Sequence, residues 1–83
     1  MDAFQKAIQV DLAMEIEAHA LGCAYDVKNE LHYDVVGRQA FGKLLGLIQA
    51  YHILNGNGVD VCFVHERAKE EIAGQLALIE GAA

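Results

Sequence analysis

Residues 36–54, VGRQAFGKLLGLIQAYHIL, place apolar side chains at the spacing of an α-helix. These side chains recur every three or four residues and share one broad face: Val36, Ala40, Leu44, Leu47, Ile48, Tyr51 and Leu54. The run stops at Asn55-Gly56-Asn57-Gly58, whose residue types favour a turn. The stretch therefore predicts a central helix with a wide buried face, followed by a turn.

The segment before it, from about residue 3 to residue 21, has the same periodicity. Asp2 is placed to cap its N-terminus, and Gly22 is placed to end it. One apolar ladder recurs every four residues: Phe4, Ile8, Leu12 and Ile16. A second apolar strip lies about a third of a turn or more away: Ala3, Val10, Met14 and Leu21. A helix with two apolar strips contacts two neighbours, which favours a bundle or an oligomer.

Residues 60–80 form a third segment of helical periodicity, which Gly81 closes. Its apolar stripe has six members: Val61, Val64, Ala68, Ile72, Leu76 and Ile79. No linker, repeat or low-complexity stretch separates the three segments. The sequence therefore predicts a single all-α domain over residues 1–83, a small three-helix bundle that self-association completes.

Two stretches, 23–36 and 59–65, fit strands as well as helices because apolar residues alternate in them. The alternating residues are Tyr25, Val27, Leu31, Tyr33 and Val35 in the first stretch and Val59, Val61, Phe63 and His65 in the second. The alternative fold is α+β, in the order α-β-β-α-β-α, with a small antiparallel sheet. The absence of Thr and the weak turn type at Asn29-Glu30 favour the all-α interpretation.

The composition indicates a surplus of apolar surface. Hydrophobic residues make up 54% of the 83 residues, and no disulfide or zinc framework compensates for the small size. A chain this short buries only about 60% of its unfolded surface. We therefore expect the remaining apolar surface to contact a second copy, as a homodimer, or another protein.

The net charge of −6 excludes two classes of partner. The six basic residues are scattered, so direct binding of nucleic-acid phosphates or of an anionic membrane is not expected. No apolar run is long enough to cross a bilayer. Cys23 and Cys62 suit reduced thiols in the cytoplasm, and we expect both to be small buried side chains.

The sequence carries no convincing catalytic or metal site. It lacks Ser and Thr, and a pair formed by Cys62 and His65 has no third group to orient it. We expect a protein that is not an enzyme and needs no cofactor. The weak metal candidates are Asp11, Glu15 and His19, which stack on one helix face. An ordinary i, i+4 pair between Glu15 and His19 is the expected arrangement, and no metal is predicted.

The candidate interface residues lie on the first two helices. Phe4, Ile8 and Leu12 form the apolar part on the first helix. On the second helix, Gly42, Gly46 and Ala50 have the small-xxx-small spacing that lets another backbone approach closely. The alternative interpretation is that the two glycines lie on a solvated face of the helix and contact no partner.

Three functions remain open. The first is a non-catalytic helical protein that self-associates and binds another protein as a regulator, inhibitor or adaptor. The second is an oligomer that binds a small ligand between subunits, in a pocket lined by Tyr25, Tyr33, Tyr51 and histidines. The third is an acidic inhibitor that imitates the phosphates of a nucleic acid, for which the high hydrophobicity is unfavourable.

Overall fold

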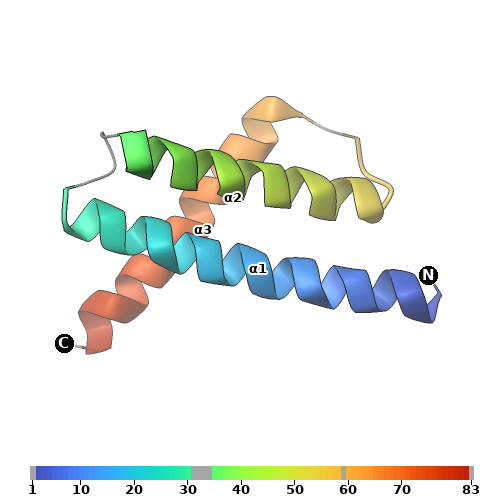
Figure 1. Cartoon of the computed structure of the whole chain (residues 1–83), viewed down its shortest axis with the longest axis horizontal. Helices are drawn as coiled ribbons and strands as arrows, with labels where there is room; N and C mark the ends of the chain where they lie inside the picture. The colour runs from blue at the N-terminus through green and yellow to red at the C-terminus, as the bar shows by residue number, and fades with distance from the viewer. Residues whose placement is uncertain (1, 31–34, 59, 83) are drawn as a thin grey trace.

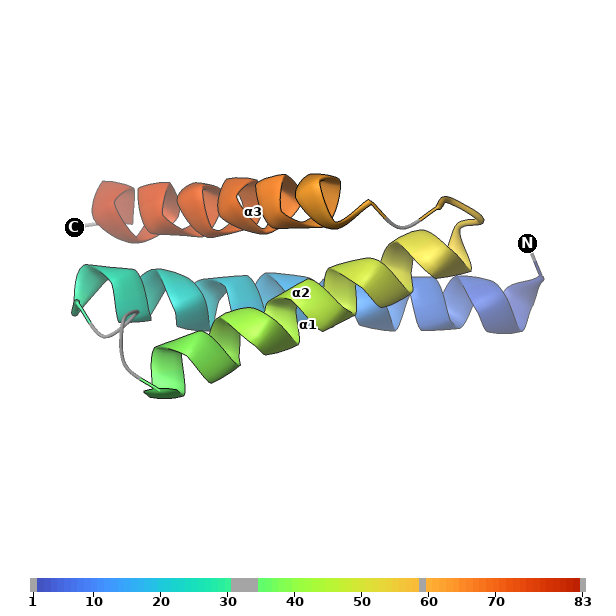
Figure 2. The same ribbon diagram turned by 90° about the horizontal axis from the view of Figure 1, so that it is seen from above.

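The computed structural model describes residues 2–30, 35–58 and 60–82, and these residues form three helices (Figure 1). The helices are α1 (Ala3–Lys28), α2 (Val35–Leu54) and α3 (Val61–Ala82). α1 and α2 run antiparallel, and α3 crosses them on one side (Figures 1 and 2). The described ranges contain no strand. The all-α three-helix bundle is therefore confirmed, and the α+β alternative is wrong.

The residues expected to alternate in strands are helical wherever they are described. Tyr25 and Val27 belong to α1, Val35 starts α2, and the first turns of α3 contain Val61, Phe63 and His65. Leu31, Tyr33 and Val59 lie outside the described residues. The alternation in the second stretch suggested a strand because Phe63 does not lie on the apolar face of a helix. In the structure Phe63 is half-exposed on the surface of α3.

The predicted end of α1 at Gly22 is wrong. Gly22 lies inside the helix, which continues for more than a turn to Lys28. Cys23 and Ala24, just beyond Gly22, are buried in the bundle. Their burial offsets the cost of about 1 kcal/mol that a glycine imposes inside a helix. Asn29 caps the C-terminus of the helix instead, and Glu30 takes the left-handed conformation with a φ of 60°.

Side-chain caps start α1 and α3. The Asp2 Oδ1 atom accepts a hydrogen bond from the Gln5 backbone N–H (2.8 Å), and the Asp2 backbone N–H donates to Gln5 Oε1 (3.2 Å). The predicted cap at Asp2 is therefore confirmed and forms a reciprocal capping box. Asp60 acts similarly at α3, where its Oδ1 accepts from the backbone N–H of Cys62 (2.9 Å).

The predicted turn at residues 55–58 is also confirmed. The Asn57 N–H donates to the His52 carbonyl and the Gly56 N–H donates to the Ile53 carbonyl, both at 3.0 Å. This pair of hydrogen bonds is a Schellman motif, which needs a left-handed residue directly after the helix. Gly56 supplies that conformation with a φ of 78° and no steric cost.

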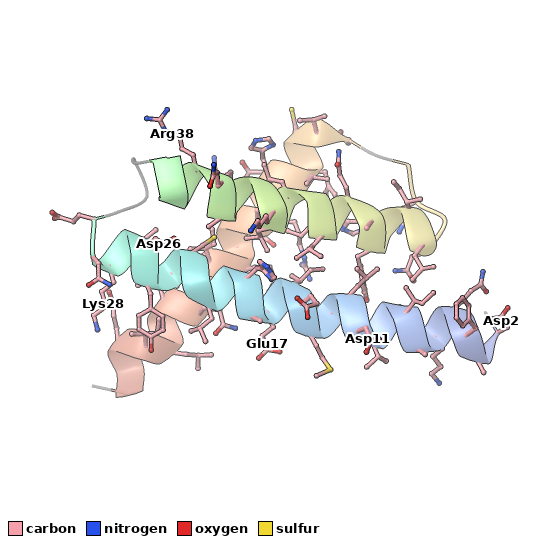
Figure 3. The ribbon with its side chains drawn as sticks, in the orientation of Figure 1. Asp2, Asp11, Glu17, Asp26, Lys28 and Arg38 are labelled. Carbon is pink, nitrogen blue, oxygen red and sulfur yellow. The ribbon has the colours of Figure 1, made fainter. Side chains whose placement is uncertain are left out.

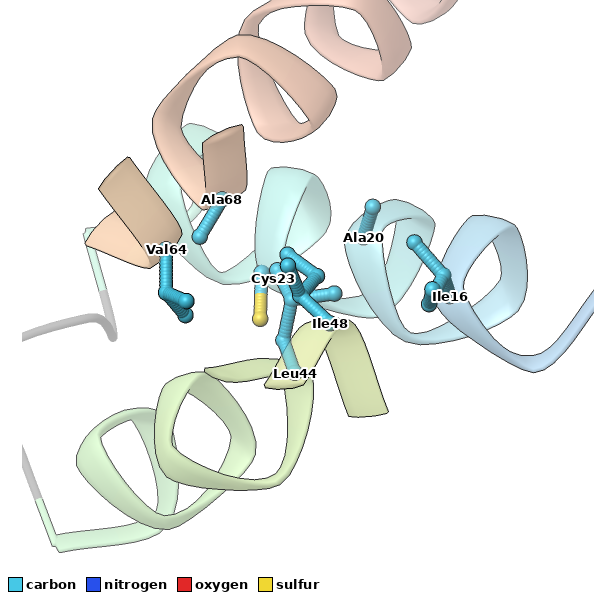
Figure 4. Close-up of a cluster of buried hydrophobic side chains, with 7 residues drawn as sticks. All are labelled: Ile16, Ala20, Cys23, Leu44, Ile48, Val64 and Ala68. Atoms are coloured by element: carbon cyan, nitrogen blue, oxygen red, sulfur yellow. The ribbon is translucent and has the colours of Figure 1, made fainter. Parts of the chain in front are cut away.

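The core is a small cluster at the point where the three helices cross (Figure 4). Its buried members are Ile16, Ala20, Cys23, Leu44, Ile48, Val64 and Ala68. Only Leu44 and Ile48 are large side chains with almost no exposure. The predicted apolar face of α2 is therefore confirmed as the centre of the core.

The bundle exposes more surface than its mass requires. Its accessible surface is 5569 Å², whereas a folded monomer of this mass exposes about 4,900 Å². Its radius of gyration is 13.4 Å, against about 12 Å for a compact domain of this length. The three helices alone therefore leave apolar surface uncovered.

The two cysteines differ in burial. Cys23 lies buried in the core, and Cys62 is exposed, with both thiols free. The expectation that both are buried is therefore wrong for Cys62. It lies in the first turn of α3, on the side of that helix opposite the buried Val64.

Candidate interaction surface

The second apolar strip of α1 is uncovered along its whole length. Val10, Met14 and Leu21 are 52%, 64% and 37% exposed, and Tyr25 continues the strip with 47% exposure. With Ala3 and Ala7, these side chains fall within a sector of about 60° of the helical wheel. We call this set the α1 stripe: Ala3, Ala7, Val10, Met14, Leu21 and Tyr25.

The stripe is uncovered because the other helices pack against a different face of α1. The buried residues Ile16, Ala20 and Cys23 define that face, whose centre lies about 145° from the stripe. In addition, α3 lies over only the C-terminal part of α1, and the N-terminal part of α1 extends beyond the end of α3 in Figure 2. No residue from 3 to 15 is buried.

A polar cluster holds the N-terminal half of α1 against the end of α2. The Gln9 Nε2 atom donates to Asn55 Oδ1 (3.0 Å) and lies 3.3 Å from the Tyr51 hydroxyl. Asn55 Nδ2 in turn donates to the Tyr51 carbonyl (2.8 Å). Sequence reasoning missed Gln9, because its partners lie more than forty residues away in the chain.

The predicted interface ladder is covered progressively along α1. Phe4 is 74% exposed, Ile8 and Leu12 are half-buried, and Ile16 is buried. Their direct contact with another protein remains a prediction. Phe4 is the best placed of the three because the bundle itself barely covers it.

The small residues of α2 face open space. Gly42, Gly46 and Ala50 are exposed, and a Cβ atom added at either glycine would meet no heavy atom within 4 Å. Within the part of the chain that the structure describes, therefore, no close approach of a second backbone requires these glycines. Contact with a second chain at this face remains a prediction.

The weak metal candidates are only partly brought together. The His19 Nδ1 atom lies 2.8 Å from the Glu15 carbonyl oxygen and 3.6 Å from Glu15 Oε2. Asp11 is exposed one turn earlier. Among the described residues, no three His, Cys, Asp or Glu side chains are grouped as metal ligands would be. The geometry is that of a local i, i+4 pair.

Three acidic side chains of α3 are paired with bases of the same helix. The Arg67 guanidinium lies 3.3 Å from Glu71 Oε1 and 3.6 Å from Glu70 Oε2. The Lys69 Nζ atom lies 3.8 Å from Glu66 Oε1. These exposed pairs contribute little to stability. They also partly neutralise the group of carboxylates formed by Glu66, Glu70 and Glu71.

The imidazole of His65 packs between α2 and α3. His65 is half-buried, its Nδ1 atom lies 3.0 Å from the Val61 carbonyl oxygen, and its ring meets that of Phe41 edge to face. A histidine held in this way between two helices packs as part of the bundle. Cys62, three residues earlier, is exposed.

The described residues of the three helices form an apolar cleft and a smaller, more polar cavity. The larger is an apolar cleft of about 470 Å³ between the C-terminal end of α1, the N-terminal end of α2 and α3. Six apolar side chains line it with Gly37, Arg38 and Lys69: Cys23, Val27, Phe41, Ile72, Ala73 and Leu76. Burial raises the pKa of the Cys23 thiol, and the nearby Asp26 carboxylate raises it further.

The smaller cavity, of about 230 Å³, is more polar. Tyr51 and His52 line it together with Glu17, Arg67 and Glu71. The ligand pocket of tyrosines and histidines between subunits remains a prediction; within one chain, only Tyr51 and His52 of these residue types line this cavity. Tyr25 belongs to the exposed α1 stripe rather than to this cavity, and Tyr33 lies outside the described residues.

Comparison of the chain with protein-family models, curated proteins and solved structures finds no match. None of the helices in the described residues combines the length and the apolar character that crossing a bilayer requires. Among the described residues, the α1 stripe contains four of the exposed large apolar side chains on one helix face, and it is the candidate interaction surface.

Proposed function

We propose that this protein is a non-catalytic, acidic helical module that self-associates as a dimer and binds another protein as a regulator, inhibitor or adaptor. The observation that carries the proposal is the uncovered α1 stripe, with Val10, Met14, Leu21 and Tyr25 all exposed. Exposed apolar patches of this kind mark protein interaction sites in soluble proteins.

The magnitude of the surplus surface supports a dimer. The accessible surface of 5569 Å² exceeds that of a typical monomer of this mass by about 700 Å². A stable protein interface of standard size removes about 800 Å² from each partner. One interface would therefore bring the exposed surface of each chain close to the normal value.

Sedimentation velocity over a range of micromolar concentrations tests the proposal. We expect the wild-type chain to form a dimer whose fraction increases with concentration. Met14→Glu, which places a charge in the middle of the stripe, is expected to produce a monomer with unchanged helix content. Ala77→Glu is the matched control, because Ala77 is exposed on α3 and the change in net charge is the same. A monomeric wild-type chain at all concentrations would refute the proposal.

The proposed place of action is a reducing compartment such as the cytoplasm. Both thiols are free, and Cys62 is exposed. An exposed thiol persists in its reduced form where glutathione and thioredoxin are active.

A second candidate function is the binding of a small apolar molecule in the cleft between the C-terminal end of α1, the N-terminal end of α2 and α3. The volume of about 470 Å³ lies within the range of about 300–1,000 Å³ that is usual for ligand pockets. Native mass spectrometry of the freshly purified protein would detect such a ligand as additional mass. Ala73→Leu would fill the cleft and prevent binding, whereas Ala77→Leu, one turn further along α3, would not.

Imitation of nucleic-acid phosphates has less support. Its test is the capture of a basic nucleic-acid-binding protein at low salt, with release as the ionic strength rises. The pairing of Glu66, Glu70 and Glu71 with neighbouring bases counts against it.

A further inference from the structure

We propose that α1 of one copy packs antiparallel against α1 of a second copy, with a two-fold axis that passes near residue 12 of both helices. This inference depends on the self-association proposed above, and it adds the surface, the orientation and the register. The occupant of the α1 stripe is thus a second copy of the same chain.

Four residues of the α1 stripe have a self-complementary spacing in this register. Ala3, Val10, Met14 and Leu21 are separated by seven, four and seven residues, a pattern that reads the same in both directions. A two-fold interface requires this property, because each patch must match its own copy in reverse. In the antiparallel pair, Val10 faces Met14 of the second copy, and Ala3 faces Leu21 of the second copy.

Side-chain size favours the antiparallel orientation over the parallel one. Each layer of the antiparallel pair combines a smaller side chain, Ala3 or Val10, with a larger one, Leu21 or Met14. The distance between the two helix axes is then nearly constant and near the 8–10 Å of packed helices. A parallel pair would instead oppose Leu21 with Leu21 and Ala3 with Ala3, which leaves one end crowded and the other loose.

Charge is complementary in the same register. Lys6 and Glu17 lie along the same flank of the stripe, and both are exposed. When the helices pair about residue 12, Lys6 of each copy lies beside Glu17 of the other. Glu17, labelled in Figure 3, is exposed and also borders the smaller cavity together with Arg67 and Glu71 of α3. The dimer thus gains two ion pairs at the edge of the interface, where they favour this register over shifted ones.

The surroundings of α1 leave room for the second copy. The overlap of the two helices covers residues 3–21, which includes the half of α1 that α3 does not cover (Figure 2). All residues of the α1 stripe within this overlap are exposed. In this register Tyr25 remains at the end of the interface.

Disulfide trapping tests the orientation. In the Cys23→Ala, Cys62→Ala background, Ala3→Cys and Leu21→Cys proteins are prepared separately and oxidised alone or after mixing, with circular dichroism to verify folding. We expect a rapid disulfide only in the mixture. In the antiparallel pair, two Ala3→Cys residues lie about 27 Å apart along the helices. Rapid trapping of Ala3→Cys with itself would show a parallel pair and overturn the inference.

Ala50→Cys in the same background distinguishes this interface from the glycine face of α2. Rapid trapping of Ala50→Cys, with no trapping in the Ala3→Cys and Leu21→Cys mixture, would overturn the α1 interface and leave self-association intact. A chain that sediments as a monomer would refute both proposals.

Charge exchange tests the register. Lys6→Glu and Glu17→Lys are each expected to weaken the dimer by about tenfold in Kd, and the double variant is expected to restore it. Lys69→Glu on α3 matches Lys6→Glu in charge and should leave Kd unchanged. Failure of the double variant to recover affinity, with both single variants impaired, would overturn the proposed pairing.

Discussion

The two halves of α1 have the same apolar periodicity but different burial. All of the buried residues of α1 lie in its second half, from Ile16 to Ala24, whereas no residue from 3 to 15 is buried. The second half lies at the crossing with α2 and α3, and the first half is held mainly at the end of α2. Periodicity therefore identifies an apolar face, while the placement of the other helices decides which part of that face is covered.

The largest expected contrast between the halves comes from truncating the ladder. Ile16→Ala is expected to lower the free energy of unfolding by about 2–5 kcal/mol, because it leaves a cavity in the core. Ile8→Ala, at a half-buried site one turn after Phe4, should lower the free energy of unfolding by about 1 kcal/mol. Urea denaturation monitored by circular dichroism measures both values. Equal losses would show that the two halves are packed alike.

Enlarging a small side chain should produce the next largest contrast. Ala20 has no exposed surface, so Ala20→Leu is expected to cost about 1–3 kcal/mol through overpacking. Ala13 is exposed in the first half, and Ala13→Leu should change stability by less than about 0.5 kcal/mol. Thermal unfolding of the two variants provides the comparison. An Ala20→Leu variant as stable as the wild type would indicate a loosely packed crossing.

Removal of the Gln9 side chain should loosen the first half selectively. Gln9→Ala removes the donor to Asn55 Oδ1 and the contact with the Tyr51 hydroxyl, at a cost of about 1 kcal/mol. Amide hydrogen exchange should accelerate between residues 3 and 15 and remain unchanged around Ile16–Ala24. Gln39→Ala, at an exposed position of α2, is the control. Uniform acceleration along α1 would contradict this role of Gln9.

The smallest expected effect is a pH dependence at the second half. Burial holds the pKa of the Cys23 thiol above its ordinary value in the folded state. Unfolding then releases a proton at alkaline pH, so the free energy of unfolding should fall as the pH rises through the ordinary thiol range and above it. Cys23→Ala should lose this component, whereas Cys62→Ala should retain it. Chemical denaturation between neutral and alkaline pH measures the slopes.

Local features were predictable from the sequence, and tertiary ones were not. The cap at Asp2, the turn at residues 55–58 and the buried face around Leu44 and Ile48 depend on neighbouring residues only, and all three are confirmed. The Asp-x-x-Gln spacing also contained the signal for the capping box. The end of α1 was mispredicted because the burial of Cys23 outweighs the local preference of Gly22.

The sequence predicted which apolar residues form the candidate surface, but it did not predict that the other helices leave them exposed. The strip of Ala3, Val10, Met14 and Leu21 was recognised as apolar, and the structure adds that α2 and α3 leave it uncovered. The addition of Tyr25 required knowledge that α1 continues past Gly22. The hydrogen bonds of Gln9 depend on how α1 and α2 are paired, which periodicity does not specify.

The aromatic contacts between α2 and α3 provide a built-in spectroscopic reporter. The His52 ring lies 4.9 Å from that of Phe63, and the Phe41 ring lies 5.9 Å from that of His65, both edge to face. Each pair joins α2 to α3. Because the sequence has no Trp, the well-separated imidazole proton resonances, displaced by the adjacent phenyl ring currents, offer a label-free measure of whether α3 is docked.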